Sequence, residues 1–77
     1  MNQNALPNIT IYFGNNIRKF REINGYSQEE FALMCNISRA YYGRIERGEH
    51  SITIDKCEQI AKALGIHISE LFIDLPV

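Results

Sequence analysis

Apolar residues recur three and four positions apart along most of the chain, and almost no stretch alternates apolar with polar residues. Spacing of three and four positions is typical of one face of an α-helix, whereas alternation is typical of a strand. The pattern therefore predicts an all-α fold. The chain contains no internal repeat, low-complexity segment or domain linker. We therefore expect one domain over residues 10–77, preceded by a flexible arm at residues 1–9, where Pro7 and polar residues leave little to bury.

Glycine, asparagine and proline divide this domain into five predicted helices. The first is expected to run from about Tyr12 to Asn24. Phe13 and Ile17 share its apolar stripe, and Gly25 follows it as a stop signal.

The second helix and the turn after it have clear local signals. Ser27 is a predicted N-cap, and Glu30 completes a capping box three residues later. Ala32 and Cys35 lie on the apolar face, where the small alanine would let the next helix cross closely. Asn36 follows, and asparagine tolerates the left-handed conformation that a sharp turn between helices needs. A helix-turn-helix is therefore expected here.

The third helix is predicted to begin after Ser38, which would cap it. Tyr42 and Ile45 share its inward stripe. The opposite, outward side carries small and basic residues, namely Arg39, Ala40, Gly43 and Arg44.

Two further helices complete the expected fold. Thr53 caps the fourth, which ends at Gly65 as a C-cap. A short fifth helix is predicted from about Ile68 to Ile73, with His67 placed to cap it.

The charge distribution is more informative than the total. A formal net charge of −1 argues against a protein that binds any polyanion through an evenly basic surface. However, residues 18–47 hold six basic and four acidic side chains, whereas residues 49–77 hold two basic and five acidic ones. A molecule with one basic face is therefore predicted.

Composition also bears on the compartment. No apolar run reaches the roughly 18 residues of a membrane span, and the N-terminus lacks the parts of a signal sequence. We expect a soluble, cytoplasmic protein. Cys35 and Cys57 fall within apolar helical patterns and lack the spacing of a metal site, so reduced core thiols and no metal are expected.

Several motifs, in order and spacing, resemble the phage repressor and Cro type (XRE-like) of helix-turn-helix transcriptional regulator. The resemblance covers about sixty residues and implies a five-helix, lambda-repressor-like DNA-binding domain. A weaker similarity, to controller proteins of restriction-modification systems, rests on Arg39-Ala-Tyr41 and Ile45-Glu-Arg47. The motifs of the first resemblance are Phe13–Arg21, Ser27–Ala32, Asn36–Ser38, Arg44–Gly48, Ile60–Gly65 and Ser69–Phe72.

The third helix is the expected reading element, since a helix fits the DNA major groove. An arginine can donate two hydrogen bonds to guanine, worth about 1–3 kcal/mol of base discrimination. The alternative for each arginine is an ordinary solvated charge. The residues predicted to contact bases are Arg39, Ala40, Tyr41, Gly43 and Arg44.

Phosphate contacts are expected on either side of that helix, from Gln28, Ser38, Arg47 and Ser51. The resemblance implies the role of Gln28, whose alternative is a plain helix-forming residue. The negative charge of Glu49, between Arg47 and Ser51, weakens the expectation of phosphate contacts there. The resemblance also implies a buried ion pair between Arg21 and Glu46, whose disruption should cost about 3–5 kcal/mol, against under about 1 kcal/mol for a surface pair.

The C-terminal segment is rich in large apolar residues, more than one small core is expected to cover. This predicts a homodimer on a pseudo-palindromic operator, with two recognition helices about 34 Å apart. The alternative is that the segment folds back on the first and fourth helices. The predicted dimerisation residues are Ile66, Ile68, Leu71, Phe72, Ile73 and Leu75.

An enzyme is not expected. His50 and His67 lack metal-ligand spacing, and the chain has neither a nucleophile motif nor a glycine-rich phosphate loop. We expect double-stranded DNA as partner, and no cofactor, small-molecule ligand or membrane. The alternative function is an antitoxin-like protein-interaction module, because one fold can host both uses.

Overall fold

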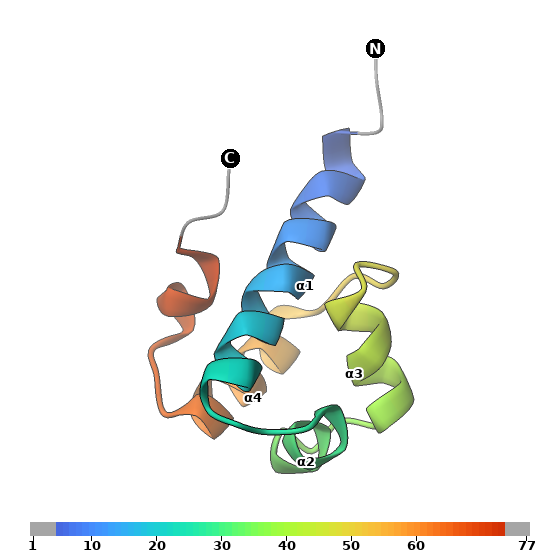
Figure 1. Cartoon of the computed structure of the whole chain (residues 1–77). Coiled ribbons are helices and arrows are strands. Elements are labelled where there is room, and N and C mark those ends of the chain that lie inside the picture. Colours follow the sequence, from blue (N-terminus) through green and yellow to red (C-terminus); the bar gives the residue numbers. More distant parts are fainter. Residues whose placement is uncertain (1–4, 74–77) are drawn as a thin grey trace.

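The protein is described here by a computed structural model, which covers residues 5–73. Within that range the chain is all-α, as expected. It forms α1 (Ala5–Ile23), α2 (Gln28–Met34), α3 (Arg39–Glu46), α4 (Ile54–Leu64) and the 3-10 helix η1 (Ile68–Phe72), as Figure 1 shows. The prediction of five α-helices is wrong in its last member. A segment of five residues forms the tighter 3-10 helix, which proteins use in short pieces.

The first helix begins earlier than its sequence pattern indicates. α1 starts at Ala5 and not near Tyr12, so residues 5–9 of the expected arm are helical, while residues 1–4 lie outside the described range. Pro7 is the third residue of α1, where the backbone N–H that proline lacks would have no intrahelical partner. Its presence therefore does not exclude a helix. In Figure 1 the first turns of α1 extend beyond the other helices.

The local signals at the other helix ends are confirmed. Ser27 caps α2 in a capping box with Glu30, and Thr53 caps α4. Asn36 has φ 59°, the left-handed value expected at the turn between α2 and α3. Gly65 ends α4 in the same conformation, with φ 72°.

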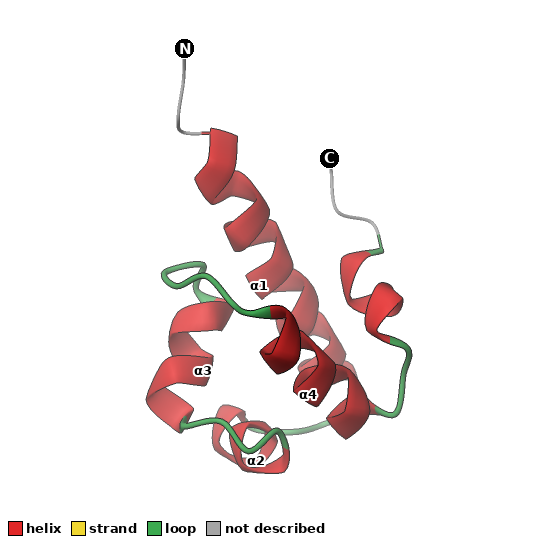
Figure 2. Ribbon diagram, turned by 180° about the vertical axis from the view of Figure 1, so that it is seen from behind, coloured by secondary structure: helices red, strands yellow, loops and turns green. Residues whose placement is uncertain are grey.

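The core lies between α1, α4 and the helix-turn-helix formed by α2 and α3, an arrangement visible from behind in Figure 2. The rings of Phe31 and Tyr42 meet edge to face, with centroids 5.5 Å apart, and join α2 to α3. Cys35 and Cys57 are free, buried thiols, as predicted. The largest fully buried side chains are Tyr42, Phe31, Ile17, Ile45, Ile60 and Leu71.

A glycine sets the distance between α1 and α3. A Cβ at Gly14 would lie 2.6 Å from the carbonyl oxygen of Glu46, at the C-terminal end of α3. Real Cβ atoms do not approach a backbone oxygen so closely, so only glycine permits this contact. α3 is thereby held against the backbone of α1.

The C-terminal segment folds back on the domain. η1 packs against α1 and α4. Asn16 of α1 donates hydrogen bonds from Nδ2 to the carbonyl oxygens of Leu71 (2.6 Å) and Ile73 (3.2 Å). The ring of Phe72 stacks on Phe13 at 5.2 Å.

This packing corrects part of the predicted dimer surface. Leu71 is 0 % exposed, because it fills the gap between the short η1 and the core, so it cannot contact a second copy. Ile66 and Ile68 are half-buried against the core, and Ile73 is 55 % exposed. Leu75 lies outside the described residues.

None of the helices within residues 5–73 is both long and apolar enough to cross a membrane.

Candidate nucleic-acid interface

The outward side of α3 borders a polar surface hollow of about 270 Å³, called the α3 hollow below. Arg39 and Arg44 are exposed on it, and neither has an ion-pair partner among residues 5–73. The hollow therefore presents cationic donors to solvent. Six of the nine residues predicted to contact DNA line it: Gln28, Arg39, Ala40, Gly43, Arg44 and Arg47.

Gln28, which lines the hollow, forms a hydrogen-bond network with Arg21 and Glu46 that joins three helices. Arg21 of α1 donates from Nε to Glu46 Oε2 (2.6 Å) and from Nη2 to Glu46 Oε1 (3.2 Å). Gln28 of α2 donates from Nε2 to the same Oε1 (2.8 Å). Arg21 also donates from Nη1 to the carbonyl oxygen of Tyr26 (2.8 Å). The carboxylate of α3 is thereby held by both α1 and α2.

The expected Arg21–Glu46 ion pair is present and largely buried, with side-chain exposures of 12 % and 2 %. Burial raises the pKa of Glu46, but hydrogen bonds from Arg21 and Gln28 outweigh it and hold this pKa below its ordinary value. The hydroxyl of Tyr42 lies near the same carboxylate, outside hydrogen-bond geometry, and is buried without a partner among the described residues. Glu46 is thus a buried anion fixed in place.

Gln28 is held by this network. One of its two amide hydrogens is directed to Glu46, and the other remains available to an acceptor. Its Oε1 lies 3.8 Å from the position that a Cβ at Gly43 would occupy, so the amide borders the α3 hollow. Glu46 therefore orients the side chain that the sequence assigned to a phosphate contact.

Gly43 is on the predicted side of α3 but is buried. A Cβ there would lie 3.1 Å from Nη1 of Arg47, whose guanidinium lies beside the helix where a larger residue would project. A base edge could reach the Gly43 backbone only if Arg47 moved. The missing side chain makes room for an arginine in this structure.

Arg47 is paired within the chain. Its Nε lies 3.0 Å from Glu49 Oε2, and its Nη2 lies 3.3 Å from Glu49 Oε1. The hydrogen bond from Arg47 lowers the pKa of Glu49 and raises that of Arg47. Both side chains are more than half exposed. The pair lies on the surface at the edge of the α3 hollow.

The other three predicted contact residues do not line the hollow. Ser38 is exposed, and its Oγ accepts from the backbone N–H of Tyr41 as the N-cap of α3. The Tyr41 hydroxyl donates to the carbonyl oxygen of Ser51 (3.4 Å), and its ring meets His50 edge to face at 4.9 Å. Tyr41 thus ties α3 to the loop that follows it.

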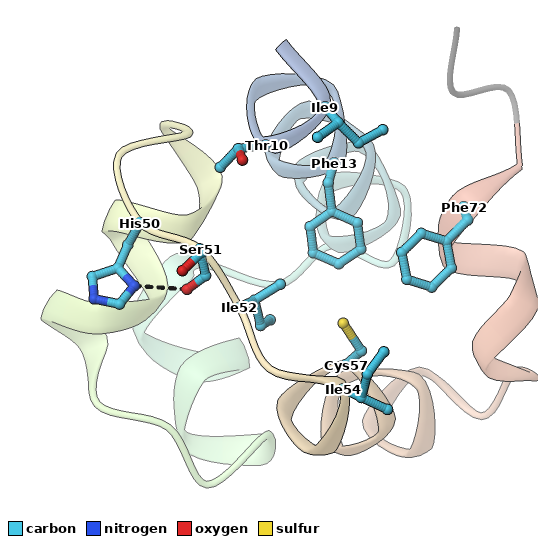
Figure 3. Close-up of a pocket in the computed structure, with 9 residues that line it drawn as sticks. All are labelled: Ile9, Thr10, Phe13, His50, Ser51, Ile52, Ile54, Cys57 and Phe72. Carbon is cyan, nitrogen blue, oxygen red and sulfur yellow. Dashed lines mark hydrogen bonds between the residues drawn. The ribbon is translucent and has the colours of Figure 1, made fainter. Parts of the chain in front are cut away.

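A second, apolar pocket of about 210 Å³ lies on a different part of the molecule, between α1, the loop at residues 50–52, α4 and η1. Figure 3 shows the rings of Phe13 and Phe72 side by side in the lining of this pocket, and Cys57, which also lines it, is buried. Ile54 is 70 % exposed beside this pocket. Within residues 5–73, no group of three potential ligands could hold a metal ion.

Three hydrogen-bonded contacts, two of them at the predicted site, were not predicted from the sequence. The Gln28–Glu46 hydrogen bond joins residues 18 positions apart, and no local pattern signals it. The Arg47–Glu49 pair has a local signal, an arginine and a glutamate on either side of a glycine with positive φ. Asn16, which holds η1, carries no signal that distinguishes it from a surface asparagine.

A compact helical domain with two short helices at a tight turn, the second cationic on its exposed side, is a helix-turn-helix domain. The chain belongs to the helix-turn-helix family HTH_3 of transcriptional regulators, whose model matches residues 17–71. The residues matched by the family model therefore include α2, α3 and α4, which contain the helix-turn-helix of the described fold.

Similar proteins include two control proteins. The chain is 42 % identical to control protein C.MunI from Mycoplasma sp over 71 residues, which cover 91 % of this chain and 96 % of that protein. It is 38 % identical over 65 residues to control protein C.BamHI from Bacillus amyloliquefaciens, covering 83 % of this chain and 80 % of that protein.

A solved structure extends the likeness to three dimensions. The restriction-modification controller protein C.AhdI from Aeromonas hydrophila superposes with a TM-score of 0.80 at 35 % identity, and the match covers 82 % of this chain and 96 % of that chain. The similarity thus spans most of both molecules.

Proposed function

We propose that this chain is a sequence-specific, double-stranded-DNA-binding regulator of the restriction-modification controller type, acting as a homodimer on a pseudo-palindromic operator. One observation carries the proposal: the exposed side of α3 presents Arg39 and Arg44 to a polar hollow bordered by the oriented amide of Gln28. The similarity to control proteins along nearly the whole chain supports the controller type. The same likeness favours a binding function over catalysis.

The residues have distinct roles in this proposal. Arg39 and Arg44 donate to base edges, and Ala40 lies where it can contact a thymine methyl group. Gln28 and Arg47 contact phosphates, which position the helix but carry no sequence information. Four further residues remain proposed DNA contacts but are less accessible to DNA, because each lies outside the hollow or beneath another side chain. They are Ser38, Tyr41, Gly43 and Ser51.

The test is selection of bound duplexes from a random DNA pool by the purified protein. An enriched inverted repeat is expected. Arg39→Ala and Arg44→Ala should each relax the preference at one or two positions per half-site, whereas Gln28→Ala should weaken binding to all sequences alike. Arg18→Ala, an exposed arginine of α1 outside the hollow, is the matched control and should leave the preference unchanged.

Two outcomes contradict the proposal. If both arginine variants keep the full sequence preference of the parent, α3 does not read the bases as proposed. If no sequence is enriched at all, the protein does not bind DNA sequence-specifically as proposed, and the antitoxin-like alternative gains support.

The homodimer is proposed to form through exposed apolar side chains around η1 and the apolar pocket. Phe72 is 41 % exposed, and Ile54 and Ile73 are exposed beside it. A two-fold contact through this surface would bury them and could set two α3 helices about 34 Å apart, the spacing of successive major grooves on one DNA face.

A further inference from the structure

Arg47, a proposed phosphate contact, already holds an anion of its own chain. Two nitrogen donors of its guanidinium, Nε and Nη2, face the two oxygens of the Glu49 carboxylate at 3.0 and 3.3 Å. This is the parallel, two-bond geometry by which arginine binds either a carboxylate or a phosphate. The Nε–Nη2 edge, one of the edges at which a DNA phosphate could bind, is therefore occupied in the free protein.

The backbone fixes Glu49 in this position. Its N–H donates to the carbonyl oxygen of Arg44 (2.8 Å), and the N–H of Gly48 donates to that of Ile45 (3.0 Å). Gly48 has φ 73°, which reverses the chain directly after α3. Because the backbone of Glu49 is anchored to the end of the helix, only the freedom of its side chain is lost when the pair forms.

The absence of a side chain at Gly43 gives Arg47 room beside α3. The side chain of Arg47 lies beside Gly43, where any Cβ would come within 3.1 Å of Nη1. This room lies at the edge of the α3 hollow, and the guanidinium occupies it. Both members of the pair are thus positioned by the fold, although both remain exposed.

We propose that Glu49 is an intramolecular competitor for DNA phosphate at Arg47, and that it limits the sequence-independent part of the affinity. The inference rests on the proposed DNA-binding function. A phosphate that binds the Nε–Nη2 edge of Arg47 must displace the carboxylate. One that binds the remaining Nη1 donors meets the negative charge of Glu49 close by. Glu49 forms an ion pair with Arg47 and with neither Arg39 nor Arg44 among the described residues, and it acts on Arg44 only through its charge. The base contacts proposed for Arg39 and Arg44 therefore do not require Glu49 to be displaced.

The experiment compares Glu49→Gln with the parent protein in binding to a random-sequence duplex and to the selected operator. Glu22→Gln is the matched control, because Glu22 forms an equally exposed ion pair with Arg18 (3.3 Å) on α1 and loses the same charge. Fluorescence anisotropy at several salt concentrations gives the affinity and its salt dependence. The double variant Arg47→Ala/Glu49→Gln tests whether the effect passes through Arg47.

Glu49→Gln should raise the affinity for both duplexes about twofold to fivefold, the range of an exposed ion pair. The slope of log affinity against log salt should steepen by about one phosphate contact. In the Arg47→Ala background, Glu49→Gln should change the affinity no more than Glu22→Gln does.

An equal effect of Glu49→Gln and Glu22→Gln in the parent background would overturn the competition, as would an undiminished effect of Glu49→Gln without Arg47. In both cases the protein still binds DNA, so the proposed function stands. Failure of every variant and of the parent to bind either duplex would overturn the proposed function, and this inference with it.

Discussion

Gln28 donates a 2.8 Å hydrogen bond to Glu46, the same carboxylate that receives two hydrogen bonds from Arg21. The side chain at the start of α2 is therefore oriented by the end of α3. Through one carboxylate, α1, α2 and α3 are held in a single mutual geometry, which includes the orientation of the helix proposed to read DNA.

Removing Glu46 should be strongly destabilising. Glu46→Ala leaves the largely buried guanidinium of Arg21 with only the exposed carboxylate of Glu22, 4.0 Å from its Nη2, as a counter-ion. We expect a loss of about 3–5 kcal/mol in the free energy of unfolding. Urea denaturation measures it. Glu49→Ala, which breaks the exposed pair with Arg47, is the control and should cost much less. Equal losses for the two variants would show that burial does not matter to the Arg21–Glu46 pair.

Acid should weaken the fold through the same carboxylate. Because the folded-state pKa of Glu46 lies below its ordinary value of 4.5, its contribution is complete above that pH and is lost as the pH falls through the folded-state pKa. The unfolding free energy of the parent should therefore decline below about pH 4.5. Glu46→Gln should show a shallower decline, although its stability at neutral pH is lower. Parallel pH profiles would contradict the role of Glu46.

Gly14→Ala should destabilise the domain, contrary to the usual effect of alanine in a helix. Alanine is normally favoured over glycine at a helix interior by about 1 kcal/mol. Here its Cβ would meet the backbone of α3, so we expect a net loss of about 1–3 kcal/mol. Asn15→Ala, at the exposed neighbouring position, should be neutral or mildly stabilising. A Gly14→Ala protein as stable as the parent in urea would mean that α1 and α3 can move apart freely.

The turn at Asn36 should accept glycine and reject a β-branched residue. With φ 59°, the position suits glycine, so Asn36→Gly should be neutral or mildly stabilising. Asn36→Val should cost about 1–2 kcal/mol and lower the melting temperature. Leu33→Val, at an exposed right-handed position of α2, controls for the general cost of valine in a helix. The prediction fails if Asn36→Gly and Asn36→Val have the same melting temperature.

The proposed dimer can be tested without truncating the core. The parent should sediment as a dimer at tens of micromolar, and Ile73→Glu and Ile54→Glu should each shift it towards monomer, because they place a charge in the apolar contact. Leu33→Glu, at an exposed apolar position of α2 away from this surface, should leave the dimer intact. A parent protein that is monomeric at this concentration and binds DNA tightly without cooperativity would refute the dimer.

The features of this fold that depend on a few consecutive residues follow directly from the sequence. The caps at Ser27 and Thr53 were predictable because each depends on a residue and the amides two or three positions later. The left-handed turn at Asn36 was predictable for the same reason. The Arg21–Glu46 pair came from the resemblance to phage repressors and not from periodicity.

Features that depend on packing were not predictable in this way. The start of α1 was misplaced because Pro7 reads as a helix breaker unless its position in the first turn is known. Leu71 was assigned to a dimer surface because composition does not tell which of several apolar neighbours fills a gap in the core. Gly43 was predicted to contact bases because nothing local indicates that it is buried beside Arg47.

The exposed positions of α3 also bear on how such proteins diverge. Arg39, Ala40 and Arg44 are exposed, and among residues 5–73 neither arginine forms an ion pair, whereas Tyr42, Ile45 and Glu46 of the same helix are buried and fixed. Replacing exposed side chains of this kind usually changes stability by less than about 0.5 kcal/mol. Mutation can therefore change these three positions while the fold stays stable. If α3 reads DNA as proposed, descendants of one ancestral chain can come to recognise different DNA sequences without losing the fold.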